Sequence, residues 1–118
     1  MQPLLVALDV DTIDAARRLA DSLRGTVGGF KIGNRLFTSY GPSFVEELVS
    51  RGDRVFLDLK FHDIPNTVAG AVAAATRLGV WMVNVHAGGG ADMMRAAREA
   101  ADTEAAKMSS APPLVIGV

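Results

Sequence analysis

The chain has 118 residues, of which 49% are apolar, and its formal net charge is −1. This length and apolar content suffice for the core of one globular domain, so an intrinsically disordered chain is excluded. Because there is no cysteine, disulfide bonds, thiolate catalysis and thiolate metal sites are excluded too. The nearly neutral charge gives no general attraction to nucleic acid or to an anionic membrane.

The amino terminus, MQPLLV, lacks the basic region and the long apolar core of a signal peptide. No apolar run approaches the ~20 residues that are needed to span a bilayer. We therefore expect a cytoplasmic protein with no membrane partner, and the lack of cysteine fits that location.

Short apolar runs typical of buried strands recur along the chain. They cover residues 4–8, 29–32, 55–59, 81–85 and 114–118. Segments with helical periodicity separate them, and this alternation predicts parallel strands joined by helical crossovers. We find no low-complexity segment and no interdomain linker. The sequence therefore predicts an α/β fold with five strands and four helices in a single domain over residues 1–118.

Capping residues mark the expected helix boundaries. In the first helix Ile13, Ala16, Ala20 and Leu23 share one face. Asp11 or Thr12 is expected to start the first helix, and Pro42 lies in the first turn of the second. The third helix is expected to start at Asn66 or Thr67 and to end at Gly79. The fourth is expected to run from Asp92 to about Ala106.

Polar side chains occupy the end of four of the predicted strands. They are Asp9, Lys31, Asp58 with Lys60, and Asn84 with His86. The carboxyl ends of parallel strands meet at one edge of an open sheet or at one rim of a barrel, where α/β proteins place their active sites. The pattern therefore predicts a functional site at this edge.

The third strand carries the densest group of charges, with Asp58, Lys60 and Asp63 within six residues. In an extended strand, side chains two residues apart point to the same face, so Asp58 and Lys60 are expected to share a face. An ion pair at the end of an apolar strand is costly to bury. A structural salt bridge and a catalytic pair both fit the spacing alone.

The segment LDLKFHDIPNT, residues 57–67, closely resembles the signature of the orotidine 5′-phosphate decarboxylase family. Its Asp-x-Lys-x-x-Asp spacing also resembles a wider set of phosphosugar enzymes, including hexulose-phosphate synthases and keto-gulonate-phosphate decarboxylases. The continuation HDIPNT resembles the orotidylate branch. The segments VALD (6–9), FKIG (30–33) and VNVHA (83–87) resemble the same family in the same order.

The resemblance implies a (β/α)₈ TIM barrel, a homodimer, and conversion of orotidine 5′-monophosphate to uridine 5′-monophosphate and CO₂ without a metal or an organic cofactor. A full barrel needs roughly 250 residues, so we expect this chain to be the first half of one. The closing loop and the phosphate-binding arginine of the family would then lie in a complementary C-terminal half. The activity of the fragment alone is an open question.

The resemblance also implies roles for the strand-end charges. Lys60 would donate the proton that replaces CO₂, and Asp58 would lie near the substrate carboxylate and hold Lys60 charged and oriented. Lys31 would orient Asp58 and contact the ribose, while Asp9 would accept a hydrogen bond from a ribose hydroxyl. The structural alternative is a salt bridge between Asp58 and Lys60, with Lys31 and Asp9 as solvated strand-end residues.

Three further residues are implied to act across the dimer. Asp63 would reach into the partner's site and complete an alternating array of cations and anions, and Ile64 and Thr67 would line the partner's nucleotide pocket. From the residues alone, Asp63 fits a turn or a helix cap, and Thr67 fits a plain N-cap.

Other interpretations remain open. His62 and His86 with Asp58 and Asp63 could hold a divalent ion, as in a magnesium-dependent phosphosugar lyase or synthase of the same suprafamily. The three glycines at 88–90 could cradle a phosphate before a helix or serve as a flexible turn. The chain could also be a catalytically silent half-barrel that only assembles with another half.

Overall fold

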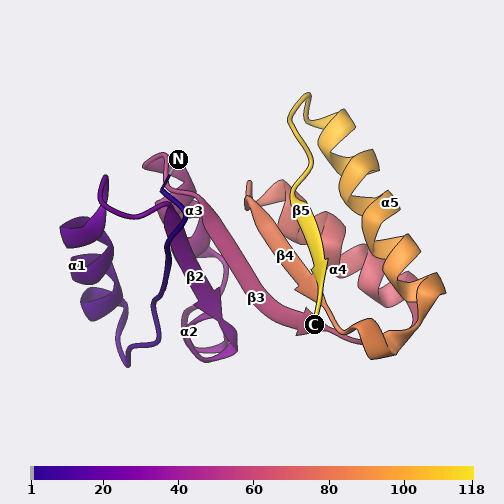
Figure 1. Ribbon diagram of the computed structural model, residues 1–118, viewed down its shortest axis with the longest axis horizontal. Coiled ribbons are helices and arrows are strands. Elements are labelled where there is room, and N and C mark those ends of the chain that lie inside the picture. Colours follow the sequence, from indigo (N-terminus) through magenta and orange to yellow (C-terminus); the bar gives the residue numbers. More distant parts are fainter. Residues whose placement is uncertain (1) are drawn as a thin grey trace. The chain divides into compact units, whose positions relative to one another are not determined.

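The computed structural model describes residues 2–118, which form two compact units. One unit ends at Asp58, and the other spans Leu59–Val118. Strand β3 (Val55–Phe61) runs through this boundary and is therefore common to both units (Figure 1). Each unit is described separately below, and the expected single domain over residues 1–118 stays a prediction.

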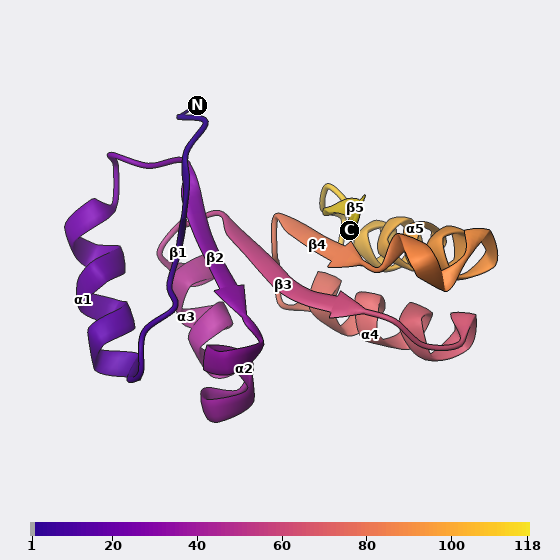
Figure 2. The ribbon, with the colours of Figure 1, turned by 60° about the horizontal axis from the view of Figure 1, so that its bottom comes forward.

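The first unit holds the parallel strands β1 (Leu5–Ala7), β2 (Gly29–Gly33) and the start of β3. In its register Ala7 pairs with Lys31, and Gly33 pairs with Asp58. Helices α1 (Ile13–Leu23), α2 (Asn34–Tyr40) and α3 (Ser43–Ser50) accompany these strands (Figure 2). Its core consists of fully buried apolar side chains, among them Leu8, Phe30, Ile32, Phe44, Val45, Leu48, Val55 and Leu57.

The cap predicted for the first helix is confirmed, because the Thr12 hydroxyl accepts the backbone N–H of Ala15 at 3.1 Å. Helix α2 is one more helix than the sequence predicted. It has only seven residues, buries Leu36 and stops at Gly41, whose φ is 73°. Such a segment is too short to show a helical period, and this is why it escaped the sequence analysis.

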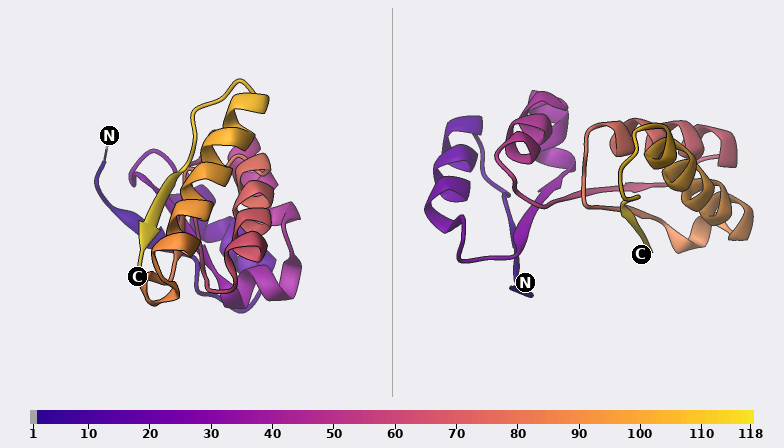
Figure 3. Two further views of the ribbon diagram at one scale, coloured as in Figure 1. Left: turned by 90° about the vertical axis from the view of Figure 1, so that its right-hand side faces the viewer. Right: turned by 90° about the horizontal axis from the view of Figure 1, so that it is seen from above.

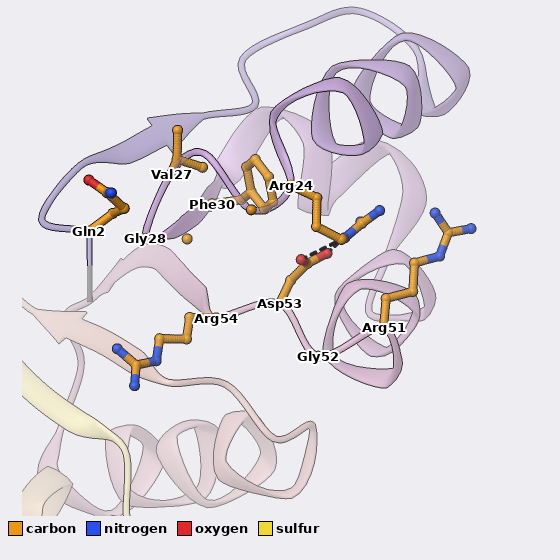
Figure 4. Close-up of a pocket in the computed structure, with 11 residues that line it drawn as sticks. Gln2, Arg24, Val27, Gly28, Phe30, Arg51, Gly52, Asp53 and Arg54 are labelled. Carbon is orange, nitrogen blue, oxygen red and sulfur yellow. Dashed lines mark hydrogen bonds and ion pairs between the residues drawn. The ribbon is translucent and has the colours of Figure 1, made fainter.

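An arginine fixes the turn that enters β3. Figure 4 shows Arg24 pointing at Asp53, and both residues line a hollow of about 330 Å³. The guanidinium donates to both Asp53 carboxylate oxygens, at 2.8 and 2.6 Å, and to Asp21 at 2.8 Å. These contacts, first with Asp53 and then with Asp21, raise the pKa of Arg24 above its ordinary value. Asp53 is almost buried, with its side chain 6% exposed, so it depends on this partner.

We expect Arg24→Ala to lower the free energy of unfolding by about 2–3 kcal/mol, because it leaves the Asp53 carboxylate enclosed without its cation. Urea unfolding measures the change. The matched control is Arg98→Ala, which removes a half-exposed pair with Asp102 on one helix surface and should cost about 0.5 kcal/mol or less. Equal losses in the two variants would contradict a special role for Arg24.

The second unit holds the end of β3 with the parallel strands β4 (Met82–Val85) and β5 (Leu114–Gly117). Helices α4 (Pro65–Arg77) and α5 (Ala91–Lys107) lie side by side along it (Figures 1 and 3). Small buried residues on both helices allow this close approach. They include Ala75, Ala97, Ala101 and Ala105.

Helix α4 begins earlier than the sequence predicted. Ile64 is its N-cap and Pro65 its first residue, so Asn66 and Thr67 lie inside the first turn rather than opening the helix. Proline suits this first position because its fixed φ is helical and its missing N–H has no helical acceptor there. The N-cap interpretation of Thr67 is therefore wrong. Among residues 2–118, no helix is long and apolar enough to cross a membrane.

Candidate functional site

Three charged side chains of the first unit meet at the carboxyl ends of its strands. The Lys31 ammonium lies 3.2 Å from Asp58 Oδ2 and 3.8 Å from Asp9 Oδ2. The parallel register causes this meeting. Lys31 pairs with Ala7, two residues before Asp9, and Asp58 pairs with Gly33, two residues after Lys31. The structure thus brings together Lys31, Asp58 and Asp9, as the strand-end pattern predicted.

These three groups differ in their exposure to solvent, and the difference favours a functional role for Lys31. Asp58 is 7% exposed, whereas Asp9 is open to solvent and Lys31 is intermediate. A buried carboxylate needs a cation and hydrogen bonds to offset its desolvation, and Lys31 supplies the cation here. The ammonium therefore lies between an enclosed anion and an exposed one, at a place that a polar molecule could reach.

Lys60 has an unusual backbone in the second unit. Its φ is 52°, the left-handed region, which costs a residue with a side chain roughly 1–2 kcal/mol. Its backbone N–H donates to Asn84 Oδ1 at 2.9 Å. The alternation of side chains along a strand holds only for extended residues. The argument from alternation that placed Asp58 and Lys60 on one face therefore does not apply. The predicted pairing of Lys60 with Asp58 itself stays a prediction.

Asp63, Ile64 and Thr67 follow on the loop that leads into α4. Asp63 Oδ1 accepts the N–H of the next residue, Ile64, at 2.7 Å. Ile64 is 65% exposed, a large fraction for an apolar side chain, and Thr67 is exposed as well. Their predicted roles across a dimer stay predictions.

A hollow of about 220 Å³ adjoins this loop in the second unit. The residues that line it include several of the predicted site residues, namely Lys60, His62, Asp63 and Thr67. The end of β3 and the start of α4 therefore place four polar residues around one small space.

The two histidines contact each other, with their ring centroids 5.2 Å apart and the planes tilted by 33°. The backbone N–H of His86 donates to the Phe61 carbonyl at 2.9 Å. Within residues 2–118, no three histidine, aspartate or glutamate side chains form a group that could hold a metal ion. The metal interpretation of His62 and His86 with Asp58 and Asp63 therefore has no support in the geometry.

The glycines at 88–90 pack tightly. A Cβ at Gly89 would collide with Met93 Sδ and lie 3.3 Å from the His62 ring, so a larger residue here would require the Met93 side chain to move. Gly90 has a φ of 99° and precedes α5 directly. Close packing against Met93 and His62 accounts for Gly89, and the turn into α5 accounts for Gly90.

The sequence analysis did not predict the role of one residue of the site, Asn84. Asn84 was placed at a strand end, but its bond to the Lys60 backbone depends on the left-handed φ of Lys60, which no periodicity in the sequence indicates. The available signal was a buried-strand amide between valines, a residue type that must find a partner.

Taken as a class, this is a parallel α/β protein whose charged and polar side chains gather at the carboxyl ends of its strands, the arrangement used by α/β barrels and open α/β sheets. The sequence model described as "Orotidine 5'-phosphate decarboxylase / HUMPS family" matches residues 2–117. The chain therefore belongs to this family.

Relatives and solved structures agree with the match. The chain is 57% identical over 116 residues to the orotidine 5'-phosphate decarboxylase of Pseudomonas entomophila (strain L48), covering 98% of this chain and 48% of that protein. The crystal structure of orotidine 5'-phosphate decarboxylase from Lactobacillus acidophilus is 32% identical with a TM-score of 0.90, over 99% of this chain and 52% of that one. An uncharacterized conserved protein from Geobacillus kaustophilus is 41% identical, also with a TM-score of 0.90, over 98% and 53%.

The chain thus spans about half the length of the proteins that it matches. Together with the five parallel strands, this coverage confirms the expected fold class, a part of the decarboxylase fold rather than the whole.

Proposed function

We propose that this chain supplies the catalytic lysine–aspartate half of an enzyme that decarboxylates orotidine 5′-monophosphate to uridine 5′-monophosphate in pyrimidine biosynthesis. The observation that carries the proposal is the contact of Lys31 with buried Asp58 and with Asp9, in a chain that matches the family from residue 2 to residue 117. The family description covers more than one activity, but the relative from P. entomophila is named a decarboxylase.

The proposed chemistry needs a fixed charge pattern. Cleavage of the bond between C6 of the pyrimidine and the carboxylate releases CO₂ and leaves the electron pair on C6. The Lys60 ammonium stabilises this carbanion and then transfers a proton to it, so one C–H bond replaces one C–C bond. Asp58, held beside Lys31, faces the substrate carboxylate and repels it in the ground state. Asp9 and Lys31 bind the ribose.

The proposal includes a homodimer with shared active sites. Asp63, Ile64 and Thr67 would act in the partner's site, and the 65% exposure of Ile64 fits a residue that is covered only in an assembly. A complementary C-terminal half would bind the phosphate. We propose a cytoplasmic location and a nucleotide as the only ligand, with no metal or organic cofactor and no nucleic-acid or membrane partner.

Turnover of orotidine 5′-monophosphate tests the proposal. The assay compares this chain alone with a full-length chimera, in which the chain is joined to the C-terminal half of the P. entomophila relative. We expect decarboxylation by the chimera and at least a 100-fold weaker rate for the chain alone, because the phosphate supplies remote binding energy that the reaction needs. An inactive but folded chimera would favour the silent assembly module instead.

Treatment with EDTA separates the proposal from the magnesium-dependent alternative. The chimera should keep its full rate after chelation, since the Lys60 ammonium supplies the positive charge that a metal ion would supply elsewhere. Loss of turnover on chelation, restored by added Mg²⁺, would instead favour a phosphosugar lyase or synthase.

A further inference from the structure

We infer that Asn84 is a positioning residue for Lys60, which sets the backbone conformation from which the lysine side chain departs. This inference rests on the proposed function, because it concerns how the proposed proton donor is held. The residues involved, Lys60 and Asn84, lie on neighbouring strands of the second unit and are joined by the bond from the Lys60 N–H to Asn84 Oδ1, 2.9 Å long.

Asn84 is buried where a polar side chain requires a reason. It is 2% exposed and lies between Val83 and Val85, which are also buried. A buried amide without hydrogen bonds destabilises the fold, so an asparagine at this position is tolerated only with partners. Its Oδ1 finds one in the backbone of Lys60, which makes the amide part of the local structure of β3.

The backbone of Lys60 needs such a partner in turn. At a φ of 52° Lys60 departs from the extended backbone conformation of a strand. At the next residue the main chain bonds to the segment that follows β4, since the Phe61 carbonyl accepts the backbone N–H of His86 at 2.9 Å. The Asn84 amide therefore supplies the acceptor for the N–H of a residue whose backbone is left-handed.

Lys60, the residue with the left-handed backbone, is also the proposed proton donor. A left-handed residue within a strand changes the direction of its own Cα–Cβ bond relative to its extended neighbours. Strained backbone of this kind persists only where the surroundings fix it. Asn84 thus holds the Lys60 side chain in a direction that a regular strand would not give.

A second buried polar residue in the same unit offers a matched control. Thr76 is also 2% exposed, and its hydroxyl donates to the Val72 carbonyl at 2.8 Å within α4. It contacts none of the proposed site residues through that bond. Thr76→Val removes a buried hydrogen bond at nearly constant volume, and it measures the purely structural cost of losing one.

The first test measures hydrogen exchange at the Lys60 amide in the full-length chimera. We expect Asn84→Ala to speed exchange at Lys60 by about tenfold or more relative to the unsubstituted protein, while Thr76→Val leaves that amide unchanged. Unchanged exchange at Lys60 in Asn84→Ala would overturn the inference. This measurement does not depend on activity, so it decides the inference even if the proposed decarboxylation fails.

The second test measures kcat and KM for orotidine 5′-monophosphate in the same variants. A displaced proton donor costs transition-state stabilisation more than substrate binding, so we expect Asn84→Ala to lower kcat by about 10- to 100-fold with KM changed by less than about threefold. Asn84→Asp keeps an oxygen acceptor and should recover most of kcat. Thr76→Val should change neither constant. An equal effect of Asn84→Ala and Thr76→Val on kcat would reduce Asn84 to a structural residue.

Discussion

Replacing Lys60 with alanine in the full-length chimera should lower kcat for orotidine 5′-monophosphate by at least about 10⁴-fold. The estimate combines loss of the proton donor with loss of the positive charge that stabilises the carbanion, since each effect alone accounts for about 10²-fold or more. The Lys60 side chain is exposed and lines the 220 Å³ hollow, so its removal should leave the free energy of unfolding nearly unchanged. Steady-state decarboxylation and urea unfolding are the two measurements.

The chain provides a matched control for this experiment at the far end of α5. Lys107 is also an exposed lysine, and its ammonium lies 3.8 Å from Glu104 of the same helix. Lys107→Ala removes the same charge and the same side chain, and it should leave kcat unchanged. Turnover of the Lys60→Ala chimera within about tenfold of the parent would remove Lys60 from the mechanism.

The architecture could be predicted because it depends on patterns that span several residues. Each of the five apolar runs became a strand, and the strand-helix order required parallel pairing. The same order brought Lys31 to Asp58 and Asp9, since parallel strands place their carboxyl ends together. Side chains at equivalent strand ends therefore belong to the predictable part of the site.

The parts that escaped prediction depend on single residues. The left-handed φ of Lys60 leaves no periodic trace, and lysine is not a residue type that favours it. The first turn of α4 begins at Pro65 because proline fits there, which moved Thr67 from a cap into the helix. In both cases the local backbone, rather than the hydrophobic pattern, decides where a functional side chain lies.

The loop between β3 and α4 provides the sharpest test of the proposed dimer. Asp63→Ala and Lys60→Ala should each inactivate the chimera when present alone. If Asp63 acts in the partner's site while Lys60 acts in its own, a mixed dimer contains one site with both lesions and one site with neither. Random association of equal amounts makes about half of the dimers mixed, so about a quarter of the parent activity should return.

Mixing the two inactive chimeras after brief unfolding and joint refolding makes this measurement. The control mixes each variant with itself, which must stay inactive, and a tag on one variant quantifies the mixed dimers. Recovery near a quarter requires that intact sites draw residues from both chains. If mixed dimers form and activity stays absent, the bond from Ile64 N–H to Asp63 Oδ1 becomes the better account of Asp63, as a turn residue within its own chain.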